Sequence, residues 1–301
     1  MQILPVLLAG GLGKRLLPFS TEMCPKQFLY LLEGKISFFQ SSVLKMRKIF
    51  ANQQLVIVCN QRNVSLIRKQ LSAIKEANYL MLVENERRNT FGAVLFGLKY
   101  AEMYNYTHLF ICTCDAYIEN EIAFTQDIGT ACKICLHCDK HICFGLPVLQ
   151  ASENYGYIQI GERINVDKNK DRQEEFNDVF YVNRFIEKPT YELAKKFFKD
   201  NGYLWNSGFY IFNISTLIEE VKQYEPYAFD VYKKMEIQEN RSNKCAMSDD
   251  FSKINNISID IAIVQKSKKM LCCIAHFDWC DVGSITIFKE LLSKGKIHLF
   301  D

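Results

Sequence analysis

The fold is decided by the stretch Leu8-Ala9-Gly10-Gly11-Leu12-Gly13-Lys14-Arg15-Leu16, which places a glycine-rich turn directly after an apolar run of strand length. Glycines in such a turn let backbone N–H groups approach a phosphate. A Walker A loop would need Ser or Thr where Arg15 stands, and a dinucleotide-binding loop would need a third glycine where Leu16 stands. The turn therefore predicts a phosphate-binding loop of another kind, with the pattern G-G-x-G-x-R-L.

Outward from this loop, apolar runs of strand length alternate with longer amphipathic stretches. The predicted strands are Gln2–Ala9, Gln54–Cys59, Tyr79–Val83 and His108–Cys114, and the predicted helices are Phe38–Phe50, Asn63–Lys75 and Thr90–Tyr104. This rhythm predicts an α/β fold of Rossmann-like type, with a mixed, mainly parallel sheet flanked by helices. Ligands bind at the carboxyl ends of the strands in such sheets, where the glycine loop and Asp115 both fall.

The second half of the chain has a less regular pattern. Its predicted strands are Phe176–Phe185 and Trp205–Phe212, its predicted helices are Tyr191–Asp200 and Ser215–Gln223, and the charged segment Asn165–Asn177 is expected to form a hairpin tip. No Pro/Gly-rich linker separates the two halves. We therefore expect one continuous α/β domain over residues 1–301.

Composition narrows the classes of partner. The 301 residues carry a formal net charge of only +3, with Lys and Arg scattered among Asp and Glu, which favours a small anionic substrate over a nucleic acid. The apolar segment Met1–Ala9 lacks a basic start and breaks at Gly10, so it predicts a buried strand and not a signal peptide. No apolar stretch is long enough to cross a bilayer. We expect a cytoplasmic protein that binds neither nucleic acid nor membrane.

Twelve cysteines are expected to be reduced thiols in a chain of this length. One cluster has spacing that suggests a metal site, and it comprises Cys132, Cys135, Cys138 and Cys143 with His137 and His141. The first three thiols fall at the end of a predicted helix, where residues three apart drift around the axis, and Cys143 begins the strand-like run Ile142–Val148. Core packing is the favoured interpretation, with a metal-binding interaction protein as an alternative.

Two cationic side chains lie at or just after the glycine loop. Arg15 is near its end, and Lys26 follows a short distance later in Pro25-Lys26-Gln27-Phe28. Together they can reach one polyphosphate. The combination resembles the sugar-1-phosphate nucleotidyltransferases, and Pro25–Leu29 narrows the resemblance toward the bacterial mannose-1-phosphate guanylyltransferases. The segments that continue it are Glu84 with Arg88-Asn89-Thr90, Phe110–Asp115, Tyr155–Ile158, Arg184–Pro189, Leu204–Gly208, Ser258–Ala262 and Trp279–Ser284.

The resemblance implies which residues form the site. The nucleotide-binding group is Leu8, Ala9, Gly10, Gly11, Gly13, Lys14, Arg15, Lys26, Glu84, Arg88, Asn89 and Thr90. The sugar-phosphate-binding group is Tyr155, Gly156, Glu187, Lys188, Asn206 and Gly208. Asp115 and Asp281 would hold Mg²⁺ or Mn²⁺, and with Arg15 and Lys26 they form the catalytic set. Glu84 would accept hydrogen bonds from guanine, or it is a solvated loop carboxylate.

The activity implied is transfer of GMP from GTP to α-D-mannose 1-phosphate, giving GDP-mannose and pyrophosphate by Mg²⁺-dependent in-line displacement. Residues 1–115 would form the nucleotide-binding half and residues 116–290 the sugar-phosphate-binding half. The alternatives are a nucleotidyltransferase for another sugar 1-phosphate, of heptose or glucose type, or for another NTP. A different class is an inactive regulatory protein that binds nucleotide sugars.

Three departures from the family pattern set further expectations. Ala116 stands where the family has His after the metal-binding Asp, and Phe91-Gly92 replaces Ala-Pro, so the base pocket is expected to be reshaped. The chain stops at Asp301, so we expect no cupin domain and no isomerase activity. The missing extension leaves either a monomer or a homodimer formed through another surface.

Overall fold

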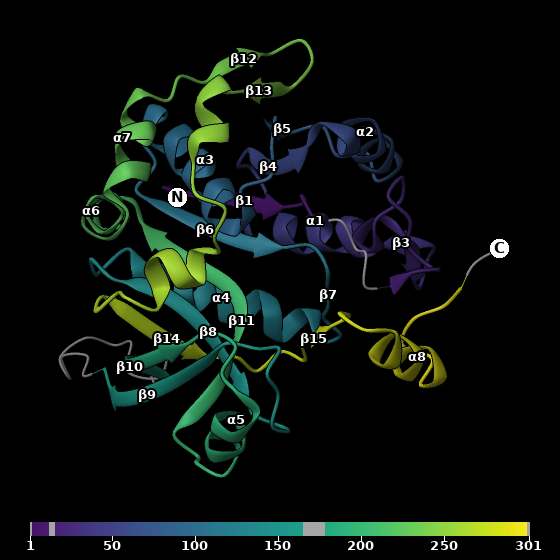
Figure 1. Cartoon of the computed structure of the whole chain (residues 1–301). Coiled ribbons are helices and arrows are strands. Elements are labelled where there is room, and N and C mark those ends of the chain that lie inside the picture. Colours follow the sequence, from purple (N-terminus) through teal and green to yellow (C-terminus); the bar gives the residue numbers. More distant parts are fainter. Residues whose placement is uncertain (1, 12–15, 165–177, 300–301) are drawn as a thin grey trace.

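The computed structural model describes residues 2–11, 16–164 and 178–299 (Figure 1). The charged segment Asn165–Asn177 and the loop residues Leu12, Gly13, Lys14 and Arg15 lie outside the described residues. In the part described, no helix has both the length and the apolar character needed to cross a membrane.

The described residues form strands and helices that alternate through the first half of the chain and are less regular in the second half. The strands are β1 (Ile3–Leu8), β2 (Tyr30–Leu32), β3 (Ile36–Ser37), β4 (Leu55–Asn60), β5 (Tyr79–Glu84), β6 (His108–Thr113), β7 (Ala116–Tyr117), β8 (His141–Pro147), β9 (Tyr157–Arg163), β10 (Val179–Ile186), β11 (Tyr203–Asn213), β12 (Gln238–Asn240), β13 (Cys245–Met247), β14 (Met270–Ile274) and β15 (Cys280–Asp281). The helices are α1 (Phe38–Ile49), α2 (Val64–Ala73), α3 (Asn89–Met103), α4 (Glu121–Cys135), α5 (Tyr191–Phe198), α6 (Ile214–Tyr224), α7 (Pro226–Lys234) and α8 (Ile285–Ser293).

Each strand and helix predicted above is present, with bounds that differ by a few residues. The main sheet of the described residues runs in the order β12-β13-β5-β4-β1-β6-β11-β8-β14-β10-β9 (Figure 1). Strands β5, β4, β1 and β6 are parallel to one another, as the alternating pattern predicts. Strand β13, which the pattern did not predict, adds a further parallel strand beside β5. Beyond β6 most pairs are antiparallel, starting with β6 against β11. The fold is therefore mixed α/β, and three of its parallel pairs join strands from residues 1–115.

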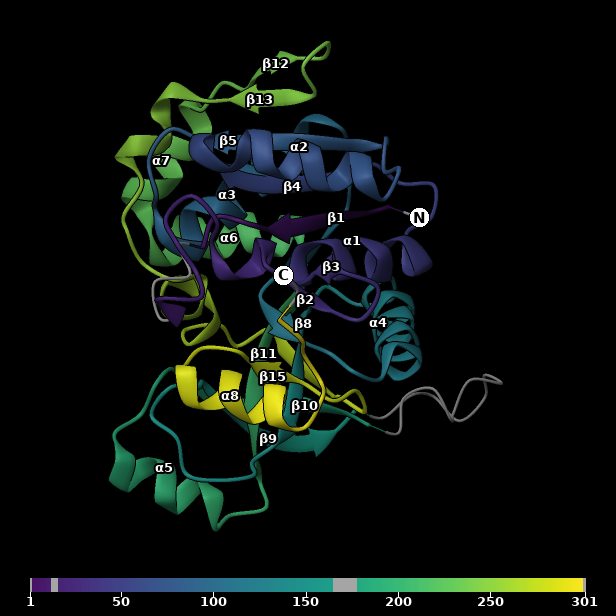
Figure 2. The ribbon, with the colours of Figure 1, turned by 90° about the vertical axis from the view of Figure 1, so that its right-hand side faces the viewer.

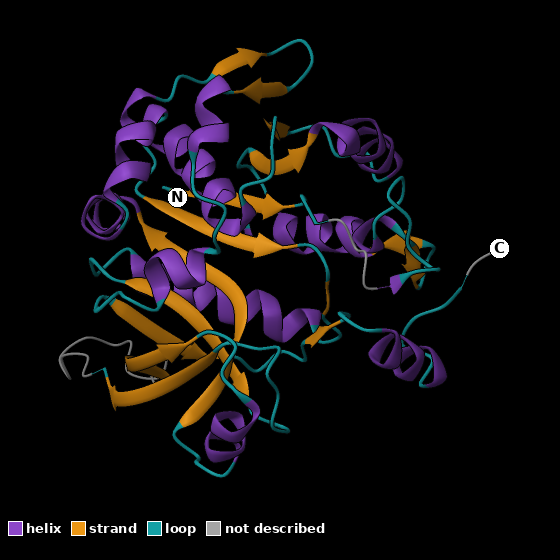
Figure 3. Cartoon of the chain, in the orientation of Figure 1, coloured by secondary structure: helices purple, strands orange, loops and turns teal. Residues whose placement is uncertain are grey.

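Both faces of the sheet are buried under helices around β1, β4 and β6 (Figures 2 and 3). In β1, Ile3 and Leu7 pack into the core on one face, with residues of α1, α2 and α4, while Leu4 and Val6 pack into the core on the other face, with α3, α6 and α7. A strand covered on both sides needs apolar residues at every position, which explains the unbroken run of β1. Burial on both faces holds the ends of the strands rigidly in place.

The helix α8 lies apart from the main sheet (Figure 1) and packs against β2. It packs against the segment that follows the glycine loop, with Leu16, Phe38, Val282 and Phe288 in one apolar cluster. The short strand β15, just before α8, pairs with β7, which directly follows Asp115. This pairing ties the end of the chain to the carboxyl edge of the sheet.

Three thiols of the cysteine cluster are buried in the core, in agreement with the interpretation that these cysteines pack as small apolar side chains. Cys132 and Cys135 are buried on one face of the sheet and Cys143 is buried on the other, so these thiols do not converge. Burial raises the pKa of Cys132 to about 12. A protonated, buried thiol behaves as a small apolar side chain.

Candidate active site

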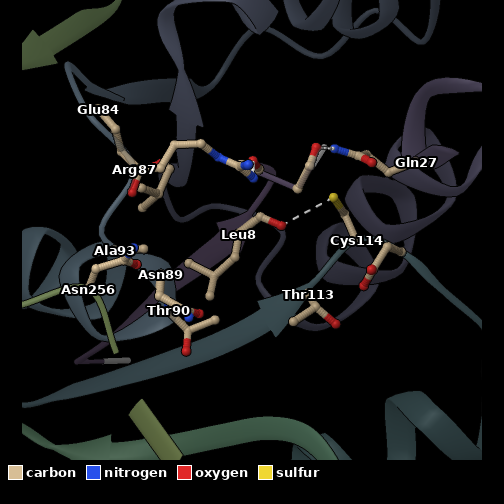
Figure 4. Close-up of a pocket in the computed structure, with 14 residues that line it drawn as sticks. Leu8, Gln27, Glu84, Arg87, Asn89, Thr90, Ala93, Thr113, Cys114 and Asn256 are labelled. Atoms are coloured by element: carbon tan, nitrogen blue, oxygen red, sulfur yellow. Dashed lines mark hydrogen bonds between the residues drawn. The ribbon is translucent and has the colours of Figure 1, made fainter. Parts of the chain in front are cut away.

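A cavity of about 390 Å³ opens at the carboxyl ends of the parallel strands (Figure 4). Its volume is in the range of small-molecule sites. The predicted nucleotide-binding residues that line it are Leu8, Gly10, Gly11, Glu84, Asn89 and Thr90, and Asp115 lines it as well. Leu8, Glu84 and Thr113 are the last residues of β1, β5 and β6. The parallel topology therefore brings these segments to one place.

The glycine loop is held by side chains that bond its carbonyl groups. Cys114 donates to the carbonyl of Leu8 (3.2 Å), and Gln27 Nε2 donates to that of Gly11 (2.8 Å) and, at 3.4 Å, to that of Ala9. Asn63 also donates to Ala9 (3.3 Å), and Arg87 donates to Gly10. In a trans peptide the N–H points opposite to the preceding C=O. The Gly10 and Gly11 N–H groups therefore point away from these donors, and neither has an acceptor among the described residues.

The sequence did not predict these contacts to the glycine loop. Gln27 was part of the Pro-Lys-Gln motif but had no predicted role of its own, and no pattern indicated a role for Asn63 or Cys114. Gln27 is almost fully buried and lines the cavity, so its hydrogen bonds fix the start of the glycine loop at the cavity wall. Preorganised amides bind phosphate oxygens without the cost of ordering them.

We expect Gln27→Met, which keeps the side-chain volume and removes the donor, to weaken binding of a nucleoside triphosphate by about 3–10-fold, the worth of one neutral hydrogen bond. Isothermal titration of both proteins with GTP measures the change. Gln61→Met, at an exposed position, is the matched control. Unchanged affinity in Gln27→Met would show that the loop keeps its shape without this donor.

Glu84 and Arg87 lie together on the side of the cavity opposite Gln27 and Cys114 (Figure 4). Glu84 is 4% exposed, and burial raises its pKa to about 7 although the charge of Arg87 acts in the opposite direction. A Cβ atom at Gly10 would come within 2.9 Å of Glu84 Oε2, so only glycine allows this close approach. The buried carboxyl group of Glu84 is therefore part of the cavity wall and not a solvated loop acid.

Arg88 lies outside the cavity lining, and its predicted contact with the nucleotide stays a prediction. Its Nη2 is paired with Glu86 Oε2 at 2.6 Å, and it does not line the cavity, whereas its neighbour Arg87 does. Phe91 is fully buried in the core, and Gly92 lies against Phe251. Phe91 and Gly92 therefore do not line the cavity themselves. The residues that α3 presents to the cavity are Asn89, Thr90 and Ala93.

The two predicted metal carboxylates converge. Lys26 Nζ lies 3.0 Å from Asp115 Oδ2 and 3.2 Å from Asp281 Oδ1, and it also donates to the carbonyl of Val282. The pairing of β15 with β7 explains this, since it sets Asp281 opposite Ala116, next to Asp115. Lys26 is 7% exposed, and although burial lowers the pKa of its ammonium group, the two carboxylates outweigh burial and raise it.

The donor set fits Mg²⁺ or Mn²⁺. Two carboxylates already surround one positive charge, and Mg²⁺ is typically bound by one or two carboxylates together with water and substrate phosphates. Within the described ranges no group of three or more His, Cys, Asp or Glu side chains is arranged to hold a metal ion. The other ligands would therefore come from water and phosphate oxygens.

The predicted sugar-phosphate residues form a second group, where β9, β10 and β11 meet. The N–H of Asn206 donates to the carbonyl of Gly156 (2.8 Å), and a Cβ atom at Gly156 would lie 2.8 Å from Glu187 Oε2. Lys188 Nζ pairs with Glu187 Oε1 at 3.0 Å. Gly208 donates its N–H to the side-chain oxygen of Asn206. The structure thus brings these five residues together.

Tyr155 packs between two indole rings. Its ring centroid is 4.8 Å from that of Trp205 and 5.5 Å from that of Trp279. Trp205 precedes Asn206, and Trp279 lies two residues before Asp281. Burial, with the charge of Asp281 nearby, raises the pKa of Tyr155 to about 12. Through these two ring contacts, Tyr155 connects the predicted sugar-phosphate-binding residues to the pair of carboxylates, Asp115 and Asp281.

Curated proteins and solved structures resemble this chain over nearly its full length. It is 30% identical over 303 residues to mannose-1-phosphate guanylyltransferase RfbM of Salmonella typhimurium, an alignment that covers 98% of this chain and 60% of RfbM. The chain thus spans about three fifths of the length of the curated relatives it matches.

Two solved structures share the fold. A mannose-1-phosphate geranyltransferase from Thermus thermophilus superposes with a TM-score of 0.81 at 22% identity, covering 97% of this chain and 80% of that one. A mannose-6-phosphate isomerase from Helicobacter pylori superposes with a TM-score of 0.73 at 24% identity, covering 93% of this chain and 100% of that one. The family model described as nucleotidyl transferase matches residues 4–294. This chain therefore belongs to the nucleotidyl transferase family.

Proposed function

We propose that the protein transfers GMP from GTP to α-D-mannose 1-phosphate, releasing pyrophosphate and forming GDP-mannose. The observation that carries the proposal is the convergence of Asp115 and Asp281 on Lys26 beside the cavity under the glycine loop. The name of the RfbM relative supports the substrates. Residues 1–115 would bind the nucleotide and residues 116–290 the sugar phosphate, within one domain.

In the proposed reaction, a phosphate oxygen of mannose 1-phosphate attacks the α-phosphorus of GTP and pyrophosphate leaves. The attacking oxygen is already anionic, so no general base is needed, and the main obstacle is the repulsion between two anions. The Gly10 and Gly11 amides would bind triphosphate oxygens, and Lys26 would stabilise charge at the α-phosphate. Arg15 would do the same at the β- and γ-phosphates, a role that rests on the sequence alone.

Asp115 and Asp281 would hold the divalent ion, which supplies charge neutralisation at the phosphate oxygens. Glu84 would accept from the N1–H and N2–H₂ of guanine, a donor pattern that adenine lacks. On the other side, Lys188 would orient the sugar phosphate and Glu187 would bond sugar hydroxyls. Each of these side chains acts by binding and orientation, and the chain forms no covalent intermediate.

A coupled pyrophosphate assay tests the proposal. With Mg²⁺ or Mn²⁺ present, we expect release of pyrophosphate from GTP that depends on mannose 1-phosphate, and its loss on addition of EDTA. Glucose and heptose 1-phosphates and the other nucleoside triphosphates form the comparison panel. Faster turnover of another pair would reassign the substrates, and tight binding of GTP without turnover would identify an inactive nucleotide-sugar-binding protein.

We expect GTP to bind more tightly as the pH rises through about 7, because Glu84 can offer two acceptor oxygens to guanine only when it is ionised. The free protein should lose stability as the pH rises from about 4.5 to about 7 and level off above, since over that range the buried carboxyl group retains a proton that the unfolded chain has already released. Titrations with GTP and thermal unfolding on both sides of that pH measure these slopes.

Glu84→Gln should flatten both pH dependences. Glu86→Gln, at an exposed carboxylate two residues away, is the matched control and should leave them as in the wild type. A pH dependence that persists in Glu84→Gln would assign it to another group.

A further inference from the structure

A buried tyrosine, an asparagine and an aspartate form a hydrogen-bonded network beside the predicted sugar-phosphate-binding residues. Asn206 Nδ2 donates to the hydroxyl oxygen of Tyr210 (2.6 Å) and to Asp260 Oδ1 (3.2 Å). The Tyr210 hydroxyl in turn donates to Asp260 Oδ1. Tyr210 and Asn206 lie on β11, and Asp260 begins the π-helical turn Asp260–Val264. The network therefore joins the central strand of the site to a segment far along the chain.

The bonding capacity of Asn206 is almost used up within the protein. Both of its N–H groups have acceptors, and its carbonyl oxygen accepts from Gly208 at 3.2 Å, which leaves one lone pair. In contrast, Asp260 Oδ2 has no hydrogen-bond partner among the described residues. Asp260 is only half-buried, whereas Tyr210 is 1% exposed. Asp260 is thus the end of the network that can accept from a ligand.

A second carboxylate faces the same place. A Cβ atom at Gly156 would lie 2.8 Å from Glu187 Oε2 and 3.4 Å from Asn206 Cβ, which places Glu187 beside the network. Burial raises the pKa of Glu187, and the charge of Asp260 raises it further. Lys188 bonds Glu187 Oε1 but not Asp260. Two neighbouring carboxylates need donors between them. A ligand with several hydroxyl groups supplies such donors.

The backbone places Asp260 next to the nucleotide cavity. The N–H of Ile259 donates to Thr90 Oγ1 (2.9 Å), and the N–H of Phe91 donates to the carbonyl of Ile257 (3.3 Å). Thr90 lines the cavity at the start of α3. The segment that carries Asp260 is therefore fixed between the cavity and the sugar-phosphate group, where a sugar joined to the nucleotide would lie.

We propose that Asp260 accepts a hydrogen bond from a sugar hydroxyl and that Tyr210 is the positioning residue that fixes its carboxylate for this contact. The inference rests on the proposed function for the location of the sugar. In this proposal, Asn206 donates hydrogen bonds that hold Tyr210 and Asp260 in place. The sugar hydroxyl groups are bound by Asp260 and Glu187.

The test compares binding of GDP-mannose and GDP by isothermal titration in Tyr210→Phe. The variant keeps the buried ring and removes the hydroxyl. We expect GDP-mannose to bind about 10-fold more weakly, as for a hydrogen bond to a charged group, with the affinity for GDP unchanged. Asp260→Asn should give the same selective loss, and the double variant should lose little more than either single variant, because both act through one carboxylate.

Tyr232→Phe is the matched control, since Tyr232 is also buried and donates to a carboxylate, Glu102, away from the site. It should bind both ligands like the wild type. Equal losses for GDP and GDP-mannose in Tyr210→Phe, or no loss, would overturn the proposal and leave Tyr210 a purely structural residue. A wild type that binds GDP-mannose no better than GDP would also overturn it.

Deoxy analogues of mannose 1-phosphate identify the hydroxyl. Removing the hydroxyl that Asp260 accepts should weaken the wild type and have no further effect in Asp260→Ala, while every other deoxy analogue should weaken both proteins alike. Absence of turnover in the wild type would count against the proposed function alone, because the binding comparison does not need turnover.

Discussion

Asp281→Asn is expected to lower kcat/KM for pyrophosphate release by about 10²–10³-fold, the usual cost of one lost electrostatic contact to a reacting phosphate. The amide keeps the shape of the carboxylate but removes its charge, so Asp115 alone would remain to hold the divalent ion. Because Asp281 is in a half-buried two-stranded pairing and not in the core, the fold should persist. Initial rates at saturating and at limiting Mg²⁺ measure the effect.

Asp278→Asn is the matched control, as it removes an exposed carboxylate three residues away. We expect it to keep wild-type rates. The Asp281 variant should also need more Mg²⁺ for half-maximal activity. Near-normal turnover of Asp281→Asn at low Mg²⁺ would remove this residue from the catalytic set.

Lys26→Met should reduce kcat by about 10²–10³-fold, because it removes the cation that we propose to stabilise charge at the α-phosphate. It should also change the response of the free protein to metal. Without the ammonium group, Asp115 and Asp281 face each other unpaired, and unpaired neighbouring charges destabilise a fold. We therefore expect a lower Tm than the wild type without metal, and a larger rise in Tm when Mg²⁺ is added.

Thermal unfolding with and without Mg²⁺ measures that difference, and Lys199→Met, at an exposed position, controls for loss of one positive charge. If Mg²⁺ stabilised Lys26→Met no more than the wild type, the two carboxylates would not form a shared cation site. If kcat stayed normal, Lys26 would have only a structural role.

Local patterns predicted much of this molecule. Alternating strand-length and helix-length runs predicted the parallel part of the sheet, because strands buried on both faces need unbroken apolar stretches. The convergence of Asp115 and Asp281 was implied by the resemblance to a family. The sequence contained no sign of the pairing of β7 with β15, two residues on each strand, that brings the carboxylates together.

Contacts between distant segments were beyond prediction. Arg87 and Arg88 are adjacent and chemically alike, and only the start of α3 decides which one reaches the cavity. Likewise, Gln27 and Asn63 bond the glycine loop because α1, α2 and β1 pack together, which no spacing encodes. The involvement of Asn206 with Tyr210 and Asp260 changes its role for the same reason.

The first half of the molecule depends on strands that are synthesised much later. β6 is covered by β11, and β5 is covered by β13, so both lateral borders of the parallel part are closed by residues beyond position 200. An emerging chain that has not reached β11 would present uncovered backbone donors and acceptors on an apolar strand, a template for aggregation. A fragment cut after residue 115 would carry that hazard permanently.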